Sequence, residues 1–280
     1  MSDKKRITIV ACEGQHDVAF ITRILHVAGY ITSKKKISTF PSPFDSLFKN
    51  IATSMVIADR KLGYQSPNYL LPSSALEKED EVIFIHSLNG DGRGEERSIL
   101  INQYSDLIGE DDFTKDLEYY FRFLFFFDAD SDGVDERLKC IVKEFNLSSP
   151  LSNGIISTYS NNEIGCYVYH ENGKHTGVLE DILLEHFSKK NTDLFDNISG
   201  FLSSNALETD RTKELHLNGD NEIRKGPSKY YLKKSQVSLF GQLQFSGMNN
   251  SVIISRSDFL RKADIDNCAQ CILIKNMFIS

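Results

Sequence analysis

The sequence predicts an α/β protein in which helices flank a parallel β-sheet. Short runs of apolar, β-branched and aromatic residues alternate with segments whose apolar residues recur at helical spacing. Several of these runs end in turns rich in glycine or acidic residues. Because parallel strands need crossover connections, such strand–helix repeats build a sheet that is buried on both faces. At 280 residues, 40% of them hydrophobic, the chain can bury a full core.

The first strand and helix are expected near the N-terminus. RITIVAC, at 6–12, is a short β-branched apolar run, and the segment that begins at Asp17 has helical spacing and closes at Gly29. Residues 31–80 contain four of the six prolines and lack a regular period, so we predict an insertion on the core there.

The strand–helix pattern then resumes. EVIFIHSL, FRFLFFF and NGIISTYS each have the composition of a strand, and the segments between them have helical period. These strands and helices are expected at 81–88, 97–108, 121–127, 133–145 and 153–160. We predict one α/β domain over residues 1–170, and a mainly helical C-terminal extension over 171–280 that packs on this core.

Composition limits the partners and the compartment. A net charge of -7 argues against binding nucleic acid by bulk charge alone. Five cysteines, an odd number, occur without a secretory signal or a long apolar segment, so we expect a cytoplasmic protein with no membrane span. Cys268 and Cys271 form a C-x-x-C, but a second pair is absent. This favours ordinary core or surface thiols over a zinc or redox site.

Acidic residues follow two of the predicted strands directly. Glu13 follows the first strand, and Asp128 and Asp130 follow the strand FRFLFFF. Ligands of open parallel sheets bind beyond the carboxyl ends of the strands, so all three carboxylates are expected at one edge. Crowded carboxylates repel each other unless a cation neutralises them. Oxygen ligands without convergent His or Cys suit Mg²⁺ or Mn²⁺.

The aspartate-rich turn has two other interpretations. DADSDG fits the opening of an EF-hand calcium loop, but the twelfth position is Lys139 rather than Glu, and a strand precedes the loop. Alternatively, the aspartates cap the next helix, which suits Asp132 or Asp135. A cap does not explain Asp128 and Asp130 together with Glu13.

These residues resemble the two motifs of the Toprim family. IVACEGQHDVAFI, with Glu13, Gly14 and Asp17, is similar to the first motif, in which an apolar strand ends in Glu-Gly and an Asp opens the next helix. FFFDADSDG resembles the second, D-x-D-x-x-G, which Asp128, Asp130 and Gly133 supply here. The resemblance implies a Toprim-like fold, with a metal-binding domain over residues 1–170.

A second resemblance covers residues 162–187. This segment is similar to one in small stand-alone Toprim-like proteins related to the overcoming-lysogenization-defect (OLD) nucleases, where a strand with Ile-Gly precedes a helix that begins Gly-x-Leu-Glu-Asp. Gly177, Glu180 and Asp181 occupy matching positions.

The resemblance implies Mg²⁺-dependent phosphodiester chemistry. Asp128 and Asp130 would bind the metal, and Glu13 would complete its shell or act as a general base or acid. Asp132 and Glu180 are candidates for a second metal, while Asp17 orients the ligands or caps its helix. An acidic first helical turn is also common for dipole reasons alone, which leaves Glu180 open.

Basic residues suggest where a phosphate backbone would lie. Arg93 and Arg97 lie in the glycine-rich NGDGRGEER, for which a plain strand-to-helix turn is slightly favoured. RKGPSKYYLKK, at 224–234, places five basic residues among tyrosines, a combination suited to single strands, although charge runs are often only solvated. The candidates there are Lys225, Lys229 and Lys233, and the resemblance implies that Lys229 or Lys233 assists at the phosphate.

Three functional classes follow. A nuclease acting on DNA or RNA is favoured, because the acids of both motifs are present. A primase-like nucleotidyl transferase is disfavoured, since no N-terminal zinc ribbon occurs, and a non-catalytic metal or nucleic-acid binding module is the third class. No Walker A sequence is present, so a separate ATPase subunit is an expected partner by resemblance. A homo-oligomer is left open.

Overall fold

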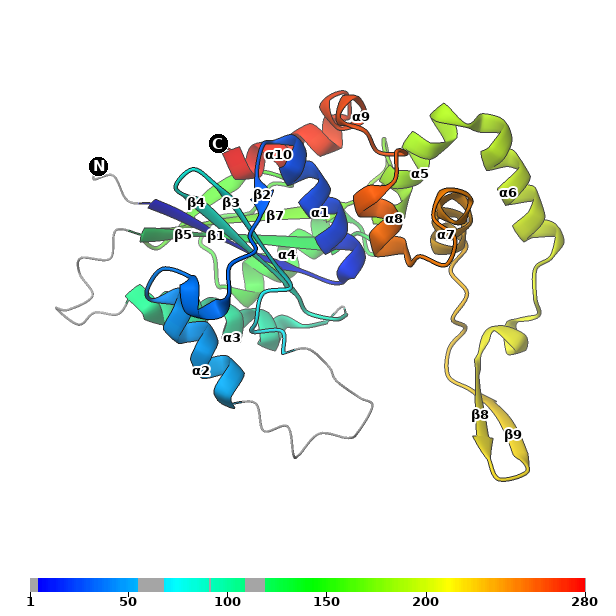
Figure 1. The fold of residues 1–280 in the computed structure, drawn as a ribbon, viewed down its shortest axis with the longest axis horizontal. Coiled ribbons are helices and arrows are strands. Elements are labelled where there is room, and N and C mark those ends of the chain that lie inside the picture. Colours follow the sequence, from blue (N-terminus) through cyan, green and yellow to red (C-terminus); the bar gives the residue numbers. More distant parts are fainter. Residues whose placement is uncertain (1–4, 55–67, 91, 109–118, 280) are drawn as a thin grey trace.

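The computed structural model describes residues 5–54, 68–90, 92–108 and 119–279. Within them, seven strands form one sheet in the order β2-β3-β4-β1-β5-β7-β6 (Figure 1). The strands are β1 (Lys5–Cys12), β2 (Ile31–Thr32), β3 (Ser74–Lys78), β4 (Glu81–Ser87), β5 (Tyr119–Asp128), β6 (Ile156–Tyr159) and β7 (Asn162–Tyr169). The central four, β4, β1, β5 and β7, are parallel. The predicted α/β class with a mostly parallel sheet is confirmed.

Helices cover both faces of the sheet because the strands are apolar on both sides. Along β5, Phe121, Phe123 and Phe125 pack into one core layer, while Leu124 and Phe126 pack into the other. The first layer is covered by α2 (Phe44–Ser54), α3 (Gly94–Ser105) and α4 (Val134–Glu144), and the second by α1 (Gln15–Val27) and α10 (Ala269–Ile279). Figure 1 shows α1 and α10 opposite α2 and α3.

The fourth parallel strand is not the one predicted. We expected 153–160 to supply it, but β6 is antiparallel to β7 and β7 pairs with β5. Ser160 and Asn161 alone join β6 to β7, and so short a connection permits only a hairpin. The parallel strand is therefore the Ile-Gly segment at 162–169.

The described parts of the predicted insertion complete one side of the sheet. β3 pairs antiparallel with β4 and β2 pairs with β3, while Phe44, Phe48 and Ile51 of α2 are buried in the core. Residues 55–67 of this region lie outside the described residues.

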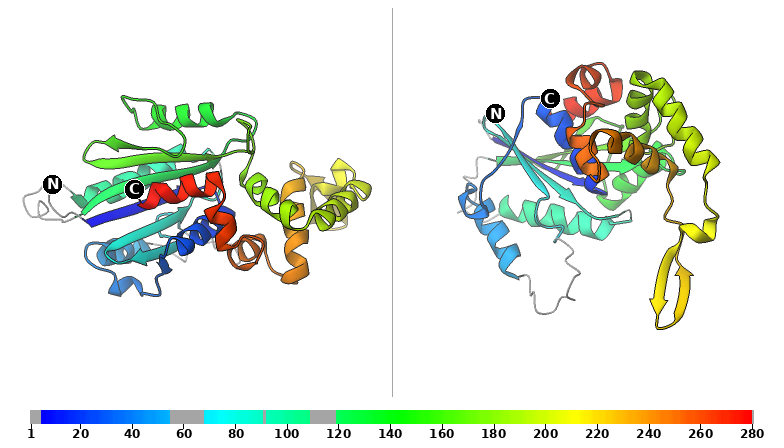
Figure 2. Two further views of the ribbon diagram at one scale, coloured as in Figure 1. Left: turned by 90° about the horizontal axis from the view of Figure 1, so that it is seen from above. Right: turned by 45° about the vertical axis from the view of Figure 1, so that its right-hand side comes forward.

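The C-terminal part is helical except for one hairpin. Its helices are α5 (Leu179–Lys190), α6 (Thr192–Ser204), α7 (Leu232–Gln244), α8 (Asn250–Arg256), α9 (Lys262–Asp266) and α10. Short 3₁₀ turns occur at Ile37–Thr39, Asp106–Ile108 and Thr209–Thr212. The exposed hairpin of β8 (Glu214–Asn218) and β9 (Asn221–Lys225) projects away from the helices (Figures 1 and 2).

The C-terminal helices return to the first helix of the chain. The guanidinium of Arg23 on α1 donates hydrogen bonds to the carbonyl oxygens of Leu260, at 2.8 Å, and Ser255, at 3.1 Å. α8 and α10 both pack against α1. Among the described helices, none is long and apolar enough to span a membrane.

Candidate metal centre

A pocket of about 370 Å³ opens at the carboxyl ends of β1 and β5. Cys12 pairs with Phe126 across these strands, so Glu13 and Asp128 leave the sheet at the same edge. The backbone N–H of Asp128 donates to Glu13 Oε1 at 3.3 Å. The predicted convergence of the two strand ends is therefore present. Four acidic residues line the pocket: Glu13, Asp17, Asp128 and Glu180.

The first turn of α1 places Asp17 beneath this pocket. The N–H of Gly14 donates to Asp17 Oδ2 at 2.7 Å, so Asp17 caps its own helix. Burial raises the pKa of Asp17 to about 7, and the charges of Glu13 and Glu180 add to this effect. Of the two roles expected from the sequence, Asp17 therefore has that of the helix cap, and it lines the pocket with the other acids.

The first turn of α5 closes the opposite side. The N–H of Leu179 donates to Asp128 Oδ1 at 2.7 Å, which places that carboxylate at the positive end of the helix. Burial nevertheless raises the pKa of Asp128 to about 8, together with the charges of Asp17, Glu13 and Glu180. The carboxylates therefore carry fewer charges near neutral pH than their number suggests.

Glu180 is held differently from Asp128. Its side chain is 2% exposed, and its Oε1 lies 3.1 Å from His16 Nδ1. Burial alone would raise the pKa of Glu180, but the hydrogen bond with His16 and the charge of Lys234 outweigh it, and the pKa falls below its ordinary value. Glu180 therefore ionises more readily than Asp17 and Asp128.

Asp130 and Asp132 do not line this pocket. Arg137 Nη2 lies 2.8 Å from Asp130 Oδ2 and 3.7 Å from Asp132 Oδ2, so α4 draws both side chains to itself. Gly133, with φ 92°, precedes α4. The sequence-based expectation that Asp130 stands beside Glu13 and Asp128 is not met in this arrangement, because the chain turns after Asp128 and Asp130 adopts a left-handed φ of 47°.

That turn nevertheless builds the site through its backbone. Asp130 and Gly177 exchange two hydrogen bonds, from Asp130 N–H at 2.8 Å and from Gly177 N–H at 3.1 Å. Gly177 has φ 133°, and a Cβ there would lie 2.5 Å from the backbone nitrogen of Glu171. Glycine is therefore required at position 177, where the turn that contains Asp130 meets the start of α5.

The two predicted phosphate-binding arginines lie in different surroundings. Arg97 is buried, and its guanidinium forms a bidentate ion pair with Glu144, with Nη2 to Oε2 at 2.7 Å. Its guanidinium carbon also lies 4.8 Å from the centroid of the Phe127 ring. Arg93 is paired with Glu96 at 2.6 Å, next to Gly90 on the pocket wall. Neither arginine lines the acidic pocket, although Arg93 lies beside Gly90, which does.

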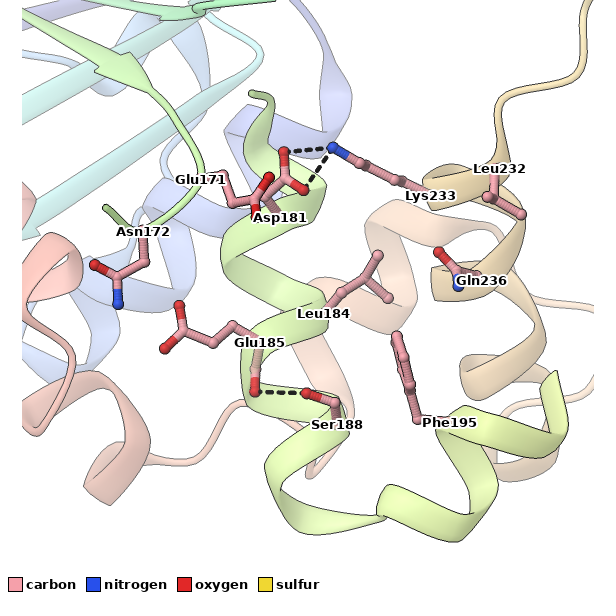
Figure 3. Close-up of a pocket in the computed structure, with 10 residues that line it drawn as sticks. All are labelled: Glu171, Asn172, Asp181, Leu184, Glu185, Ser188, Phe195, Leu232, Lys233 and Gln236. Carbon is pink, nitrogen blue, oxygen red and sulfur yellow. Dashed lines mark hydrogen bonds and ion pairs between the residues drawn. The ribbon is translucent and has the colours of Figure 1, made fainter. Parts of the chain in front are cut away.

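The predicted lysines are dispersed. Lys225 ends β9 on the projecting hairpin, and Lys229 pairs with Glu214 at 3.3 Å. Figure 3 shows Lys233 in a neighbouring pocket of about 500 Å³, where its ammonium contacts both oxygens of Asp181, the nearer at 2.6 Å. None of the three lines the acidic pocket.

Two residues of the acidic pocket were not singled out from the sequence. Lys234 lines it because the phase of α7 turns Lys234, rather than Lys233, toward Glu180. His16 lies in the first turn of α1, and its contact is with Glu180, 164 residues further along the chain. No local pattern in the sequence could have indicated that contact.

The donor set suits a hard divalent cation. Four carboxylates face a single lysine among the lining residues, and burial together with the neighbouring acids raises the pKa values of Asp17 and Asp128. All the acidic donors are oxygens, which Mg²⁺ and Mn²⁺ prefer. Among the described residues, no three of these carboxylates come within 4.8 Å of one another, so binding a cation would require their side chains to close.

A second group of metal-binding side chains lies elsewhere. His186, Cys268 and Cys271 have ligand atoms within 4.8 Å of one another. The hydrogen bond with the Cys271 thiol lowers the pKa of Cys268, against an opposing effect of burial. The sequence favours ordinary thiols here because no second cysteine pair is present, and the histidine of the cluster lies 82 residues away, on α5.

Comparisons with known proteins bear on the fold. No family model matches the chain, and no curated protein matches it. One solved structure, described as a hypothetical protein PH0156 from Pyrococcus horikoshii OT3, is similar over 97% of this chain and 99% of its own, with a TM-score of 0.53 and 14% identity. At this identity the likeness supports the α/β fold alone.

Proposed function

We propose that this protein is a metal-dependent phosphodiesterase that cleaves nucleic acid, a nuclease of the Toprim and OLD type. One observation carries the proposal: Glu13, Asp128 and Glu180 face Lys234 across one pocket at the carboxyl ends of parallel strands. Carboxylates that hold a cation, beside a lysine that neutralises phosphate, are the minimum for phosphoryl-transfer chemistry.

The residues divide into three roles. Asp128 and Glu13 would hold Mg²⁺, with Glu180 and Asp17 at its border; bound there, the ion would supply positive charge to a phosphate oxygen and lower the pKa of water. Lys234 would bind the phosphate backbone, and Arg93 would add a contact beside Gly90. The pKa of Glu180 lies below its ordinary value, and its Oε1, 3.1 Å from His16 Nδ1, would hold the imidazole in position.

Proton transfer falls to Glu13 in this proposal. Its carboxylate follows β1 and accepts from the Asp128 N–H, so it faces the space between the two strand ends. From there Glu13 would take the proton of the attacking water, and His16 could return one to the leaving oxygen. We place this activity in the cytoplasm, since all five cysteines are free. A separate ATPase subunit remains a proposed partner.

A second function is favoured by one specific observation. Asp130 is paired with Arg137 instead of facing Asp128. A site that lacks this carboxylate would bind a cation and a nucleic-acid strand without cleaving it. The chain would then act as a non-catalytic binding module.

A cleavage assay separates the two functions. Labelled single- and double-stranded DNA and RNA are incubated with Mg²⁺, Mn²⁺ or EDTA and with wild type, Asp128→Asn or Asp135→Asn. We expect Asp128→Asn to lower the cleavage rate on the order of 10³-fold or more, because it removes a charge that holds the cation. Asp135 is exposed in the first turn of α4, seven residues after Asp128, and its replacement provides the matched control.

The outcomes are distinct. Cleavage that persists in EDTA and in Asp128→Asn contradicts the nuclease proposal. Binding without cleavage under every condition supports the binding module. If Asp130→Asn costs as much as Asp128→Asn, Asp130 leaves Arg137 and joins the site during the reaction.

A further inference from the structure

The second cluster joins two elements that are distant in the sequence. His186 lies on α5, whereas Cys268 immediately precedes α10 and Cys271 lies in its first turn. The N–H of Cys271 donates to Cys268 Sγ at 3.3 Å, so the sulfur caps the helix. This N–H···S contact across a C-x-x-C is the backbone arrangement that turns two sulfurs toward one point.

The histidine of the cluster has an unmet polar atom. His186 Nε2 is buried from solvent and has no hydrogen-bond partner. A buried polar nitrogen left unpaired costs free energy, about 1–3 kcal/mol for a typical group. A bound cation would remove that cost, whereas a disulfide between the two cysteines would leave it in place.

We propose that His186, Cys268 and Cys271 bind one Zn²⁺ ion. Two thiolates and one imidazole form a borderline-soft donor set, which selects zinc over the magnesium suited to the acidic pocket. In a tetrahedral site with Zn–S bonds of about 2.3 Å, ligand atoms lie about 3.8 Å apart. Since the three ligand atoms already lie within 4.8 Å of one another, closing on the ion needs a movement of about 1 Å.

The fourth position has one acidic neighbour on α9. Asp264 is close enough that its charge acts on Cys271 and that the charge of His186 acts on it. It also pairs with Lys190 at the end of α5. We assign the fourth position to water, with Asp264 beside it. Zinc binds both cysteines as thiolates, so each thiol that still carries a proton releases it on binding.

The consequence is structural. α5 carries Glu180 in its first turn and His186 six residues later, about 9 Å along the helix. A zinc ion at His186 would tie this helix to α10, which packs on the sheet, and would fix the helix that forms one wall of the acidic pocket. This inference concerns other residues than the proposed nuclease site and does not rest on it.

Metal analysis of the full-length protein tests the proposal. Wild type, Cys268→Ser, His186→Gln and Cys140→Ser are purified without chelator, and zinc is measured by mass spectrometry. Cys140 is an exposed free thiol on α4 and is the matched control. We expect one zinc per chain in wild type and in Cys140→Ser. The affinity for zinc should fall about 100-fold or more in Cys268→Ser and His186→Gln.

Cobalt supplies a readout that depends on geometry. Co²⁺ added to metal-free protein should give the visible bands of a tetrahedral site and a thiolate charge-transfer band, both lost in Cys268→Ser while circular dichroism shows that the variant stays folded. The proposal is overturned if wild type holds no more zinc than Cys268→Ser. It is equally overturned if protein purified under reducing conditions has a Cys268–Cys271 disulfide, which would indicate a redox pair.

Discussion

The two ends of α5 carry opposite kinds of donors. Its first turn borders four carboxylates of the acidic pocket, while His186, near its last turn, meets two cysteine sulfurs. The acidic group combines strand ends with helix starts, and crowding together with burial raises the pKa of Asp17 and Asp128. The thiol group combines a helix cap with an unpaired imidazole. One helix thereby separates hard oxygen donors from soft sulfur donors.

The two groups of donors differ in charge and in burial. The carboxylates have excess negative charge and open space, so they suit an exchangeable ion and a substrate. The thiol group is compact and Cys271 is fully buried, which suits an ion that stays bound. The following predictions test whether the two groups are independent.

The largest effect is expected on metal binding, because each of two variants should lose the metal at one site only. Asp128→Asn should weaken Mg²⁺ binding about 100-fold and leave zinc content unchanged. Cys268→Ser should remove zinc and change Mg²⁺ affinity by less than about 3-fold. Calorimetric titration with Mg²⁺ and zinc analysis of the same preparations provide the measurement. Equal losses at both sites in either variant would show that the two groups are not independent.

An intermediate effect is expected from two adjacent lysines. Lys234 lines the acidic pocket, whereas Lys233 is held by Asp181. Lys234→Ala should lower kcat/KM for nucleic acid about 10-fold and reduce the salt dependence of binding. Lys233→Ala should cost less activity and about 0.5–1 kcal/mol of stability, since its ammonium is partly exposed. A larger loss of kcat/KM in Lys233→Ala than in Lys234→Ala would indicate that Lys233, rather than Lys234, contacts the phosphate.

A third prediction concerns the pH dependence of stability. In EDTA the folded protein keeps protons on Asp17 and Asp128 up to pKa values of about 7 and 8, whereas the unfolded chain releases them near pH 4. The free energy of unfolding should therefore decrease as pH rises from about 4 to about 8. Mg²⁺ stabilises the ionised carboxylates, so it should raise the melting temperature more at pH 8 than at pH 5.

A matched variant isolates the groups responsible. Asp128→Asn cannot ionise at this position, so its melting temperature in EDTA should fall less between pH 5 and pH 8 than that of wild type. The same slope in both proteins would show that Asp128 does not have a raised pKa.

The sequence alone determined the order of the main strands and helices and the convergence of Glu13 with Asp128. Apolar runs of strand length mark β1, β4 and β5, and residues that follow parallel strands must share one edge of the sheet. The direction of β6 was misjudged because composition does not distinguish a parallel from an antiparallel strand. Only the two-residue connection to β7 decides that direction.

Tertiary structure decided which charged side chains meet. Asp130 and Asp128 are two residues apart, yet a left-handed turn sends Asp130 to Arg137, and the phase of α7 puts Lys234 in the pocket instead of Lys233. His186 joins Cys268 across 82 residues for the same reason. Local pattern fixes where an element begins and which residues are apolar. The meeting of side chains depends on backbone turns and helix rotation, which packing of the whole core selects.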